Sequence, residues 1–417
     1  MDYRLPDFEE DIKIKGMPLR SQYNIRKQEY DSNSYLDFDI NNSTKSTLNV
    51  DPNESNGGIG ANIQTSMTKI TSQLNPQNIC SKNIDELNNT LFNYLYPLLN
   101  NSFIINGFAL LNLFGALYLI SSTTSEIELK TFFNFTKKDV VYAGLKKLNY
   151  FIESNNNIKM KNFMIVGNDV SYNPKIYSNI KDFCILLRPD ISKIEEETYK
   201  MNLIINKMMD TQMKNPITPE NLFNTQLMLL NTTVIHPIWE SPFDQVLNGV
   251  FNNNIHVNYL YSVGKPFGYF EDGENQMLEI KCVDKLIMGI LLSKSNSLIN
   301  IDENKLHFNI SQMKESVLDE VKIPMFKKDL KIRYNSSLKN LGIRTIFMKF
   351  IAPEMFPEGV QLQDVIQNVK IIIDTNHNKS NEHVRGYRTI RKFLCTKPFV
   401  YYFRLGETIL LIGLYNG

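Results

Sequence analysis

The sequence predicts an α+β fold with a mainly antiparallel sheet. Segments with helical periodicity come early, mostly before residue 212, and strand-like runs dominate the later part of the chain. Helices first and strands later are typical of the α+β class. The chain has 417 residues, of which 42% are hydrophobic and 21% charged, so it can bury a large core in one large domain or two ordinary ones.

Residues 1–79 differ in composition from the rest. Short acidic and basic pieces alternate there with NNSTKSTLNVDPNESNGGIG, a stretch rich in Ser, Asn and Gly. Such a stretch does not bury enough apolar surface to offset the entropy lost on ordering. We therefore expect a flexible or weakly structured extension over 1–79 and a folded domain over 80–417. The chain does not begin with a basic region followed by an apolar one, so no secretory signal peptide is predicted.

Helical periodicity begins in IDELNNTLFNYLYPLL, residues 84–99, and returns near residues 138–152 and 195–212. Between the first two lies FIINGFALLNLFGALYLI, residues 103–120, which is long enough to suggest a membrane span. Asn106 and Asn112 argue against that interpretation. A helix that is apolar all round is equally typical of the centre of a large soluble protein, and we expect burial.

Strand-like runs follow, rich in β-branched and aromatic residues. They lie at residues 163–170, 183–187, 225–235, 255–264, 267–272, 277–282, 286–293 and 319–326. Two more flank a polar, basic stretch near the C-terminus, within residues 369–405. A long connection without secondary structure is uncommon inside a compact domain and is often functional or disordered.

Charge and motifs exclude several classes of function. A net charge of +1 gives no overall attraction to nucleic acid or to an anionic membrane. The four cysteines and five histidines show neither metal-ligand nor disulfide spacing, and no GxSxG, HExxH or P-loop pattern occurs. We expect no catalytic residues, no cofactor and no metal.

Several segments, taken in order, resemble conserved segments of the serpin family. NTTVIHPIWESPFD, residues 231–244, is similar to the family pattern NAxYFKGxWxxPFD, with Asn231, Trp239, Pro242, Phe243 and Asp244 matching. Residues 202–222, 321–347 and 397–417 resemble a helix with its following turn, a strand-helix segment and the closing strands of the family. The resemblance covers most of residues 80–417.

The resemblance implies N-terminal helices packed on a large central sheet, with smaller sheets and an exposed reactive-centre loop at about residues 375–396. It also implies a monomer that inhibits serine proteases. In serpins a protease cleaves this loop, and the freed segment then inserts into the central sheet as a new strand. The richness in Asn, Ile, Lys and Tyr suggests an AT-rich genome, such as that of a large DNA virus like a mimivirus.

Because of its basic side chains, we expect the loop to be presented as a substrate to a trypsin-like protease, whose acidic specificity pocket accepts Arg. Counting back from Pro398 by the family's spacing places the scissile bond near Arg388, whereas counting forward from Thr375 places it at Arg391. Both residues remain candidates, with Arg385 as a third.

The hinge before these arginines departs from the family pattern. The family's hinge Gly falls on His377, and its run of small residues falls on Ser380, Asn381, Glu382 and His383. Alternate side chains of an inserted strand point into the sheet's buried face, and Glu382 is one of them. Burying an unpaired carboxylate costs several kcal/mol or forces its protonation. The hinge therefore disfavours protease trapping, and the alternative is a non-inhibitory serpin-fold binding scaffold.

The residues expected beneath the place where the sheet opens, called the shutter in this family, also differ. Ile105, Asn106, Gly107 and Phe108 stand where the family has Ser-Pro-x-Ser, and Gln367 stands where it has a His. Asn231 of the same cluster remains. We expect a larger, more apolar shutter (Ile105, Phe108, Asn231 and Gln367) that favours a closed sheet.

Overall fold

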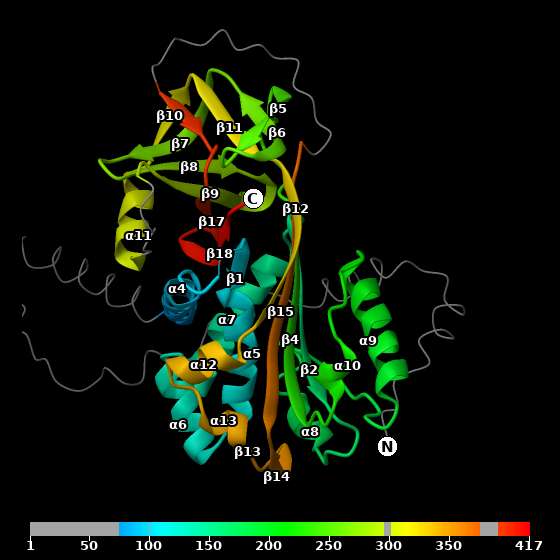
Figure 1. Cartoon of the computed structure of the whole chain (residues 1–417). Coiled ribbons are helices and arrows are strands. Elements are labelled where there is room, and N and C mark those ends of the chain that lie inside the picture. The colour runs from blue at the N-terminus through cyan, green and yellow to red at the C-terminus, as the bar shows by residue number, and fades with distance from the viewer. Residues whose placement is uncertain (1–74, 100, 296–301, 376–390) are drawn as a thin grey trace, which may run out of the picture. The chain divides into compact units, whose positions relative to one another are not determined.

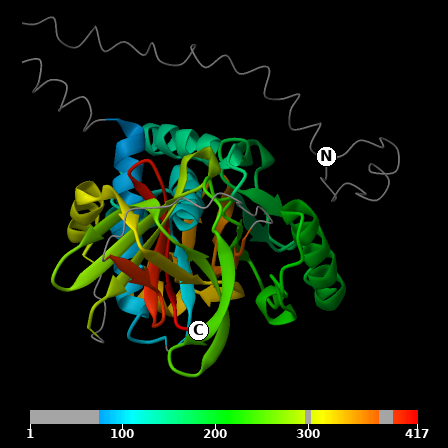
Figure 2. The ribbon, with the colours of Figure 1, turned by 90° about the horizontal axis from the view of Figure 1, so that it is seen from above.

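The structure is a computed structural model, and it describes residues 75–99, 101–295, 302–375 and 391–417 (Figure 1). Its helices are α4 (Pro76–Leu95), α5 (Gly107–Ile120), α6 (Thr123–Phe132), α7 (Lys138–Glu153), α8 (Pro174–Tyr177), α9 (Ile194–Met209), α10 (Pro219–Leu222), α11 (Glu303–Gln312), α12 (Asn335–Leu341) and α13 (Thr345–Met348). Seen from two directions, α9 and α11 lie on opposite sides of the sheets (Figures 1 and 2).

The central sheet has five strands in the order β12 (Phe326–Arg333), β15 (Leu362–Ile373), β4 (Leu227–Ile235), β2 (Ile158–Val166) and β3 (Ile185–Leu187). β12 runs antiparallel to β15, and β4 antiparallel to β2. The pairs β15–β4 and β2–β3 are parallel. The parallel pair β15–β4, in the middle of this sheet, is called the seam below.

A second, seven-stranded sheet is antiparallel throughout. Its order is β1 (Phe103–Asn106), β18 (Thr408–Tyr415), β17 (Phe399–Leu405), β9 (Leu286–Ser293), β8 (Asn275–Lys281), β7 (Lys265–Glu271) and β10 (Lys314–Leu318). A four-stranded sheet is built from β16 (Lys392–Leu394), β11 (Glu320–Pro324), β6 (Ile255–Ser262) and β5 (Gln245–Phe251). β13 (Phe350–Ala352) pairs with β14 (Phe356–Val360). The predicted α+β fold is confirmed.

The first described helix begins earlier than the sequence indicated. Asn75 caps α4 by accepting a hydrogen bond from the Gln77 N–H at 3.0 Å, and Pro76 occupies the first helical position, where its missing N–H costs nothing. Residues 76–79, assigned to the extension from composition, are thus the first turn of this helix. The predicted extension before residue 75 lies outside the described residues.

The apolar segment 103–120 is buried as predicted, but the assignment of one helix to it is wrong. Its first residues form the strand β1, and the helix α5 starts at Gly107 with Asn106 as its N-cap. Asn112 is accommodated because its amide donates to the Phe108 carbonyl and accepts from Asn149. Within the described part of the chain, no helix is long and apolar enough to cross a membrane.

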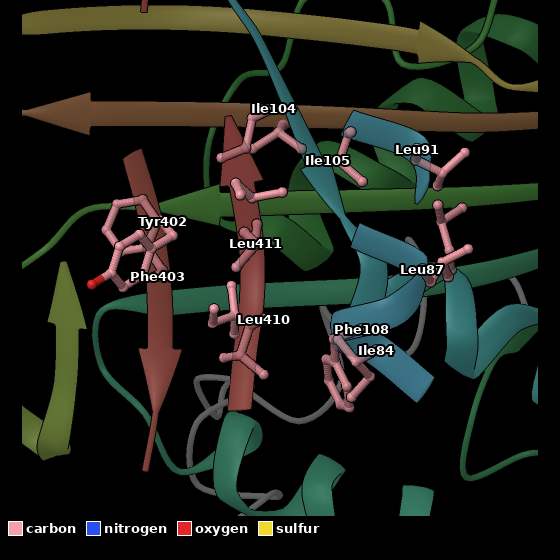
Figure 3. Packing of buried hydrophobic residues seen from close by; sticks show 14 of the residues in the cluster. Ile84, Leu87, Leu91, Ile104, Ile105, Phe108, Tyr402, Phe403, Leu410 and Leu411 are labelled. Atoms are coloured by element: carbon pink, nitrogen blue, oxygen red, sulfur yellow. The ribbon is translucent and has the colours of Figure 1, made fainter. Parts of the chain in front are cut away.

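The larger hydrophobic cluster contains residues from α4 through to β18, so residues on both sides of position 230 share one core. Figure 3 shows side chains of α4, β1, α5, β17 and β18 gathered in one place, among them Ile84, Phe108 and Leu411. A smaller cluster, which includes Ile205 and Ile366, lies between the central sheet and α9. This arrangement agrees with the one-domain expectation for the folded part.

Among the strands that the sequence did not predict, β5, β10 and β12 lie at sheet edges. In β12, FKKDLKIR, buried or half-buried side chains alternate with exposed charged ones. The alternation is the period of a strand with one face toward solvent, and the charges protect the free edge from pairing with another chain.

A buried ion pair is built into the seven-stranded sheet beside a glycine. Arg404 donates from Nε and from a terminal nitrogen to the two carboxylate oxygens of Glu279, at 2.6 and 2.5 Å. The Tyr402 hydroxyl donates to the same carboxylate at 2.7 Å, and the pKa of this phenol is raised by burial and by the nearby negative charge. The Tyr402 ring lies against Gly289, so close that an added Cβ would stand 1.9 Å from the ring carbon Cζ.

Gly289→Ala should therefore lower the free energy of unfolding by about 1–3 kcal/mol, because the Tyr402 ring has to move and its hydrogen bond to Glu279 weakens. Chemical denaturation measures this. Gly273→Ala is the matched control, since no atom lies within 4 Å of its added Cβ. Equal stability of the two variants would show that the ring moves without cost.

A chain that begins at Asn75 keeps the cap of α4 and loses only the predicted extension. We expect its melting temperature to match that of the full chain within about 3 °C. A fall of more than about 10 °C would instead show that residues before Asn75 pack on the domain.

Candidate functional site

The predicted reactive-centre loop is described only at its two ends, at Asp374–Thr375 and from Arg391 onward. The predicted hinge residues and two of the three scissile-bond candidates lie outside the described residues: His377, Ser380, Asn381, Glu382, His383, Arg385 and Arg388. The site is therefore built here from the two anchors of the loop and from the seam. In Figure 1, β15 runs toward the sheet that contains β5, β6 and β11, and β16 belongs to that same sheet.

The N-terminal anchor follows the last residue of β15. The indole N–H of Trp239 donates to the Asp374 carbonyl at 2.7 Å, and His236 Nε2 lies 3.0 Å from the Asp374 carboxylate. Trp239 itself is buried and packs edge-to-face on Phe243. The single tryptophan thus holds the backbone at the point where the loop leaves β15.

The C-terminal anchor is a short parallel ladder. The Asp319 N–H donates to the Arg391 carbonyl at 2.9 Å, and Lys392 to Leu394 pair with β11. Phe393 and Cys395 are completely buried. The chain is thus fixed from the Arg391 carbonyl onward, although the Arg391 side chain is exposed.

The seam is paired along nearly its whole length, from Leu362 opposite Leu227 to Ile371 opposite Ile235. Gln367 lies directly opposite Asn231. Two of the four predicted shutter residues are therefore neighbours across the seam.

Gln367 is bonded on the face of the seam that packs against α5. Its amide oxygen accepts from the Asn106 N–H at 2.9 Å, and its amide nitrogen donates to the Asn106 carbonyl at 3.1 Å. The hydroxyl of Tyr334, a fully buried residue, donates to the same amide oxygen at 2.9 Å. Burial raises the pKa of this phenol, so Tyr334 remains a donor at physiological pH.

Asn106 also reaches the other strand of the seam. Its side-chain amide donates to the Thr233 hydroxyl at 3.0 Å, and Thr233 donates to the Asn231 side chain at 2.9 Å. Asn231 in turn donates to Asn162 on β2 at 2.9 Å. A continuous polar chain thus joins β15, the start of α5, β4 and β2.

The shutter combines apolar and polar side chains. Ile105 and Phe108 are buried apolar residues, at 0% and 1% exposure. Asn106 and Gln367, however, bond each other across this region. The signal was present in the sequence, because Asn106 is a polar residue that directly precedes an apolar helix, where Asn is a favoured N-cap. Thr233 and Tyr334 gave no such signal.

The opposite face of the seam is covered by residues 210–218, which follow α9 and are called the strap below. Asn368 donates to the Pro216 carbonyl at 3.1 Å, and Lys370 donates to the Gln212 carbonyl, both from β15. Asn202 of α9 bonds both backbone groups of Ile217, at 2.9 and 3.0 Å. The strap is thus bonded to α9 and to β15.

The described residues contain no group of three or more His, Cys, Asp or Glu placed to hold a metal ion. All four cysteines are buried, and desolvation raises the thiol pKa of Cys80, Cys184 and Cys282 to about 12. Thiols with such a pKa are poor nucleophiles.

Solved structures share the fold at low sequence identity. Serpin48 of the insect Tenebrio molitor covers 81% of this chain and 97% of its own, with a TM-score of 0.70 and 16% identity. Native protease nexin-1 in complex with heparin covers 81% of this chain and 100% of its own, with a TM-score of 0.71 and 18% identity.

Curated relatives match over shorter stretches. Macrophage plasminogen activator inhibitor 2 of Mus musculus is 28% identical over 168 residues, which are 35% of this chain and 40% of that protein. Serine protease inhibitor 2 of Anopheles gambiae is 22% identical over 186 residues, which are 41% of this chain and 45% of that protein. These matches span less than half the length of either relative.

The family described as "Serpin (serine protease inhibitor)" matches residues 86–416, which is most of the chain. The family description names serine protease inhibitors, which agrees with the resemblance found in the sequence. A viral source stays a prediction from composition. With the strands, the Trp239 anchor and the family match in agreement, this chain belongs to the serpin family.

Proposed function

We propose that this serpin presents the arginines of residues 375–396 to a trypsin-like serine protease and is cleaved there without trapping the enzyme. Family membership supports recognition by a serine protease. The observation that carries the proposal is that the basic stretch is held at both ends, by Trp239 at Asp374 and by Asp319 at Arg391. A segment fixed at two ends and rich in Arg is suited to presentation.

Trapping requires the seam to open. A segment that leaves the end of β15 and folds back beside it has to displace β4 or β12, the two neighbours of β15. Between β15 and β4, which are parallel to each other, the new strand is antiparallel to both. Antiparallel pairing is slightly more stable per residue than parallel pairing, so the backbone bonds lost on opening are regained. The backbone therefore does not decide whether insertion is favourable.

The side chains at the seam oppose opening. Asn106 bonds Gln367 on one strand and Thr233 on the other, so parting the strands breaks one of these links. On the other face the strap has to release Asn368 or Lys370. Each hydrogen bond contributes only about 1 kcal/mol net, so these contacts slow opening without forbidding it.

The hinge is the larger obstacle. An inserted strand directs alternate side chains into the sheet's buried face, and by the family register these include Asn378, Ser380, Glu382 and Val384. Burial of the Glu382 carboxylate costs several kcal/mol, more than any one bond at the seam. Insertion must also be faster than hydrolysis of the acyl-enzyme. If insertion of the hinge is slow, hydrolysis leaves a cleaved loop and a free protease.

A non-inhibitory binding scaffold is the second candidate. The seam, paired along nearly its whole length, favours it, because a sheet that stays closed takes up no further strand. It differs from the first candidate in one measurable respect, since a scaffold need not be cleaved within residues 375–396 by any Arg-specific protease.

Replacing Gln367 by Leu tests the link across the shutter. The change leaves the backbone N–H and C=O of Asn106 and the Tyr334 hydroxyl without this partner, and buried unpaired polar groups cost about 1–3 kcal/mol each. We expect the free energy of unfolding to fall by about 2–4 kcal/mol in chemical denaturation.

Gln312→Leu, at the exposed end of α11, serves as the control and should change stability by less than about 0.5 kcal/mol. If Gln367→Leu is no more destabilising than this control, the network does not hold the seam.

Protease incubation tests the proposed function. A panel of Arg-specific serine proteases should cut the native chain between residues 375 and 396 and form no SDS-stable complex. The cleaved chain should melt within a few degrees of the intact one, because Glu382 opposes insertion. Glu382→Ala combined with His377→Gly should raise the melting temperature after cleavage well above that of cleaved wild type.

A covalent complex, or a rise of tens of degrees when wild type is cleaved, would instead establish an inserting inhibitor. Resistance of residues 375–396 to every enzyme of the panel favours the scaffold.

A further inference from the structure

A pocket with a volume of about 270 Å³ lies between the strap and the strands β12 and β15. Pockets for drug-sized ligands measure about 300–1,000 Å³, so this one suits a smaller molecule. Residues of all three segments line it: Met213 and Lys214 from the strap, Asp329 and Lys331 from β12, and Asn368 from β15. A molecule bound here therefore contacts the strap and the central sheet together.

Charged side chains of β12 lie on the face of the sheet that the strap covers. Asp329 and Lys331 are two residues apart, so they share one face. Lys331 pairs with Asn368 of β15, and directly opposite residues of an antiparallel pair also share a face. Asn368 donates to the Pro216 carbonyl of the strap at 3.1 Å, which identifies this face as the covered one. The sheet therefore presents polar side chains to the pocket.

Lys331 has no carboxylate in direct contact within the described part of the chain. Its ammonium lies 3.4 Å from the Asn215 carbonyl, which is longer than an ordinary hydrogen bond. The carboxylates of Asp364 and Glu220 act on it only from a distance, and both have nearer partners, Arg333 in the case of Asp364. Although Lys331 keeps contact with solvent, desolvation lowers its pKa. A bound anion would offset the free-energy cost of this partly desolvated charge.

The other charged groups of the pocket define which anion it suits. Lys214 supplies a second ammonium, which forms no ion pair with the other residues that the structure describes. Asp329 supplies one carboxylate, so the lining groups carry two positive charges and one negative. A ligand with a single negative charge balances this set, whereas Asp329 repels a dianion more strongly. Because an ionised carboxylate only accepts hydrogen bonds, Asp329 favours a ligand that also has a hydroxyl group.

We propose that this pocket binds a small hydroxy acid with one carboxylate, which Lys214 and Lys331 bind at the carboxylate and Asp329 at the hydroxyl. The buried residue Met213 offers an apolar contact to the rest of the molecule. The bound acid adds a link between the strap and β12 to the hydrogen bond that Asn368 already donates to the strap. This site lies apart from both anchors of the loop, and it does not depend on the proposed function.

Mandelate, a hydroxy acid with one carboxylate and a phenyl ring, is the probe. Titration of the full chain, followed by ligand-observed NMR at constant ionic strength, gives the Kd, which we expect in about the millimolar range for so small a ligand. Phenylacetate, which lacks the hydroxyl, should bind at least about threefold more weakly. Phenylethanediol, which lacks the carboxylate, should bind at least about tenfold more weakly. Mandelate should also raise the melting temperature, because it binds the native state.

Single substitutions test each assigned contact. Lys331→Met should weaken mandelate binding at least about tenfold, and Lys214→Met, on the surface of the strap, at least about threefold. Asp329→Ala should abolish the preference for mandelate over phenylacetate. Lys327→Met is the matched control, because Lys327 is exposed on the same face of β12 but does not line the pocket. It should leave the Kd unchanged within about twofold.

The inference is overturned if wild type does not bind mandelate, or if Lys327→Met weakens binding as much as Lys331→Met does. Inorganic phosphate at the same ionic strength is the last comparison. If phosphate or phenylacetate binds as tightly as mandelate, the assignment of a hydroxy acid is wrong. None of these results bears on protease recognition, which the protease incubation tests separately.

Discussion

The parallel pairing of β15 with β4 is the constraint on which the rest of the central sheet depends. Gln367 and Asn231 face each other across it, and Asn106, at the start of the buried helix α5, bonds both strands. The Asn106 side-chain oxygen also caps this helix by accepting from the Ala109 N–H at 2.8 Å. One residue therefore caps a core helix and links the two strands of the seam.

Different sets of hydrogen bonds hold the two faces of the seam. On the face that packs against α5, the neutral amides and hydroxyls are buried. Losing a hydrogen bond there costs free energy because water does not replace it. On the opposite face, side chains of β15 donate to backbone carbonyls of the strap. Asn368 and Lys370, which make these bonds, are buried, although Lys214 and Lys331 near them are exposed. The strap is therefore held by buried side chains as well.

Sequence patterns predicted the fold class, the buried segment and most strands, because alternation and helical periodicity record which face of an element is buried. They missed β12, whose charges concealed its alternation, and they merged β1 with α5, because a short buried strand and a buried helix are both continuously apolar. The hydrogen bonds of the shutter could not be predicted for another reason. The Gln367 side chain and the Asn106 backbone that it bonds lie far apart in the sequence. Predicting such a hydrogen bond requires knowing which groups meet in space, and a single sequence does not contain this information.

The C-terminal anchor at β16 and the hinge before it act at different stages. The anchor acts before cleavage, because it fixes the chain from the Arg391 carbonyl onward. After a cut before Arg391, the anchor no longer restrains the segment that follows β15. Whether this segment then inserts depends on the free-energy cost of burying its alternate side chains, since the seam regains its backbone bonds on insertion. By the family register, the carboxylate of Glu382 would weigh against insertion by several kcal/mol, whereas the bonds at the seam contribute about 1 kcal/mol each. The proposed function therefore makes one hinge side chain, more than the closure of the sheet, the difference between a substrate and a trap.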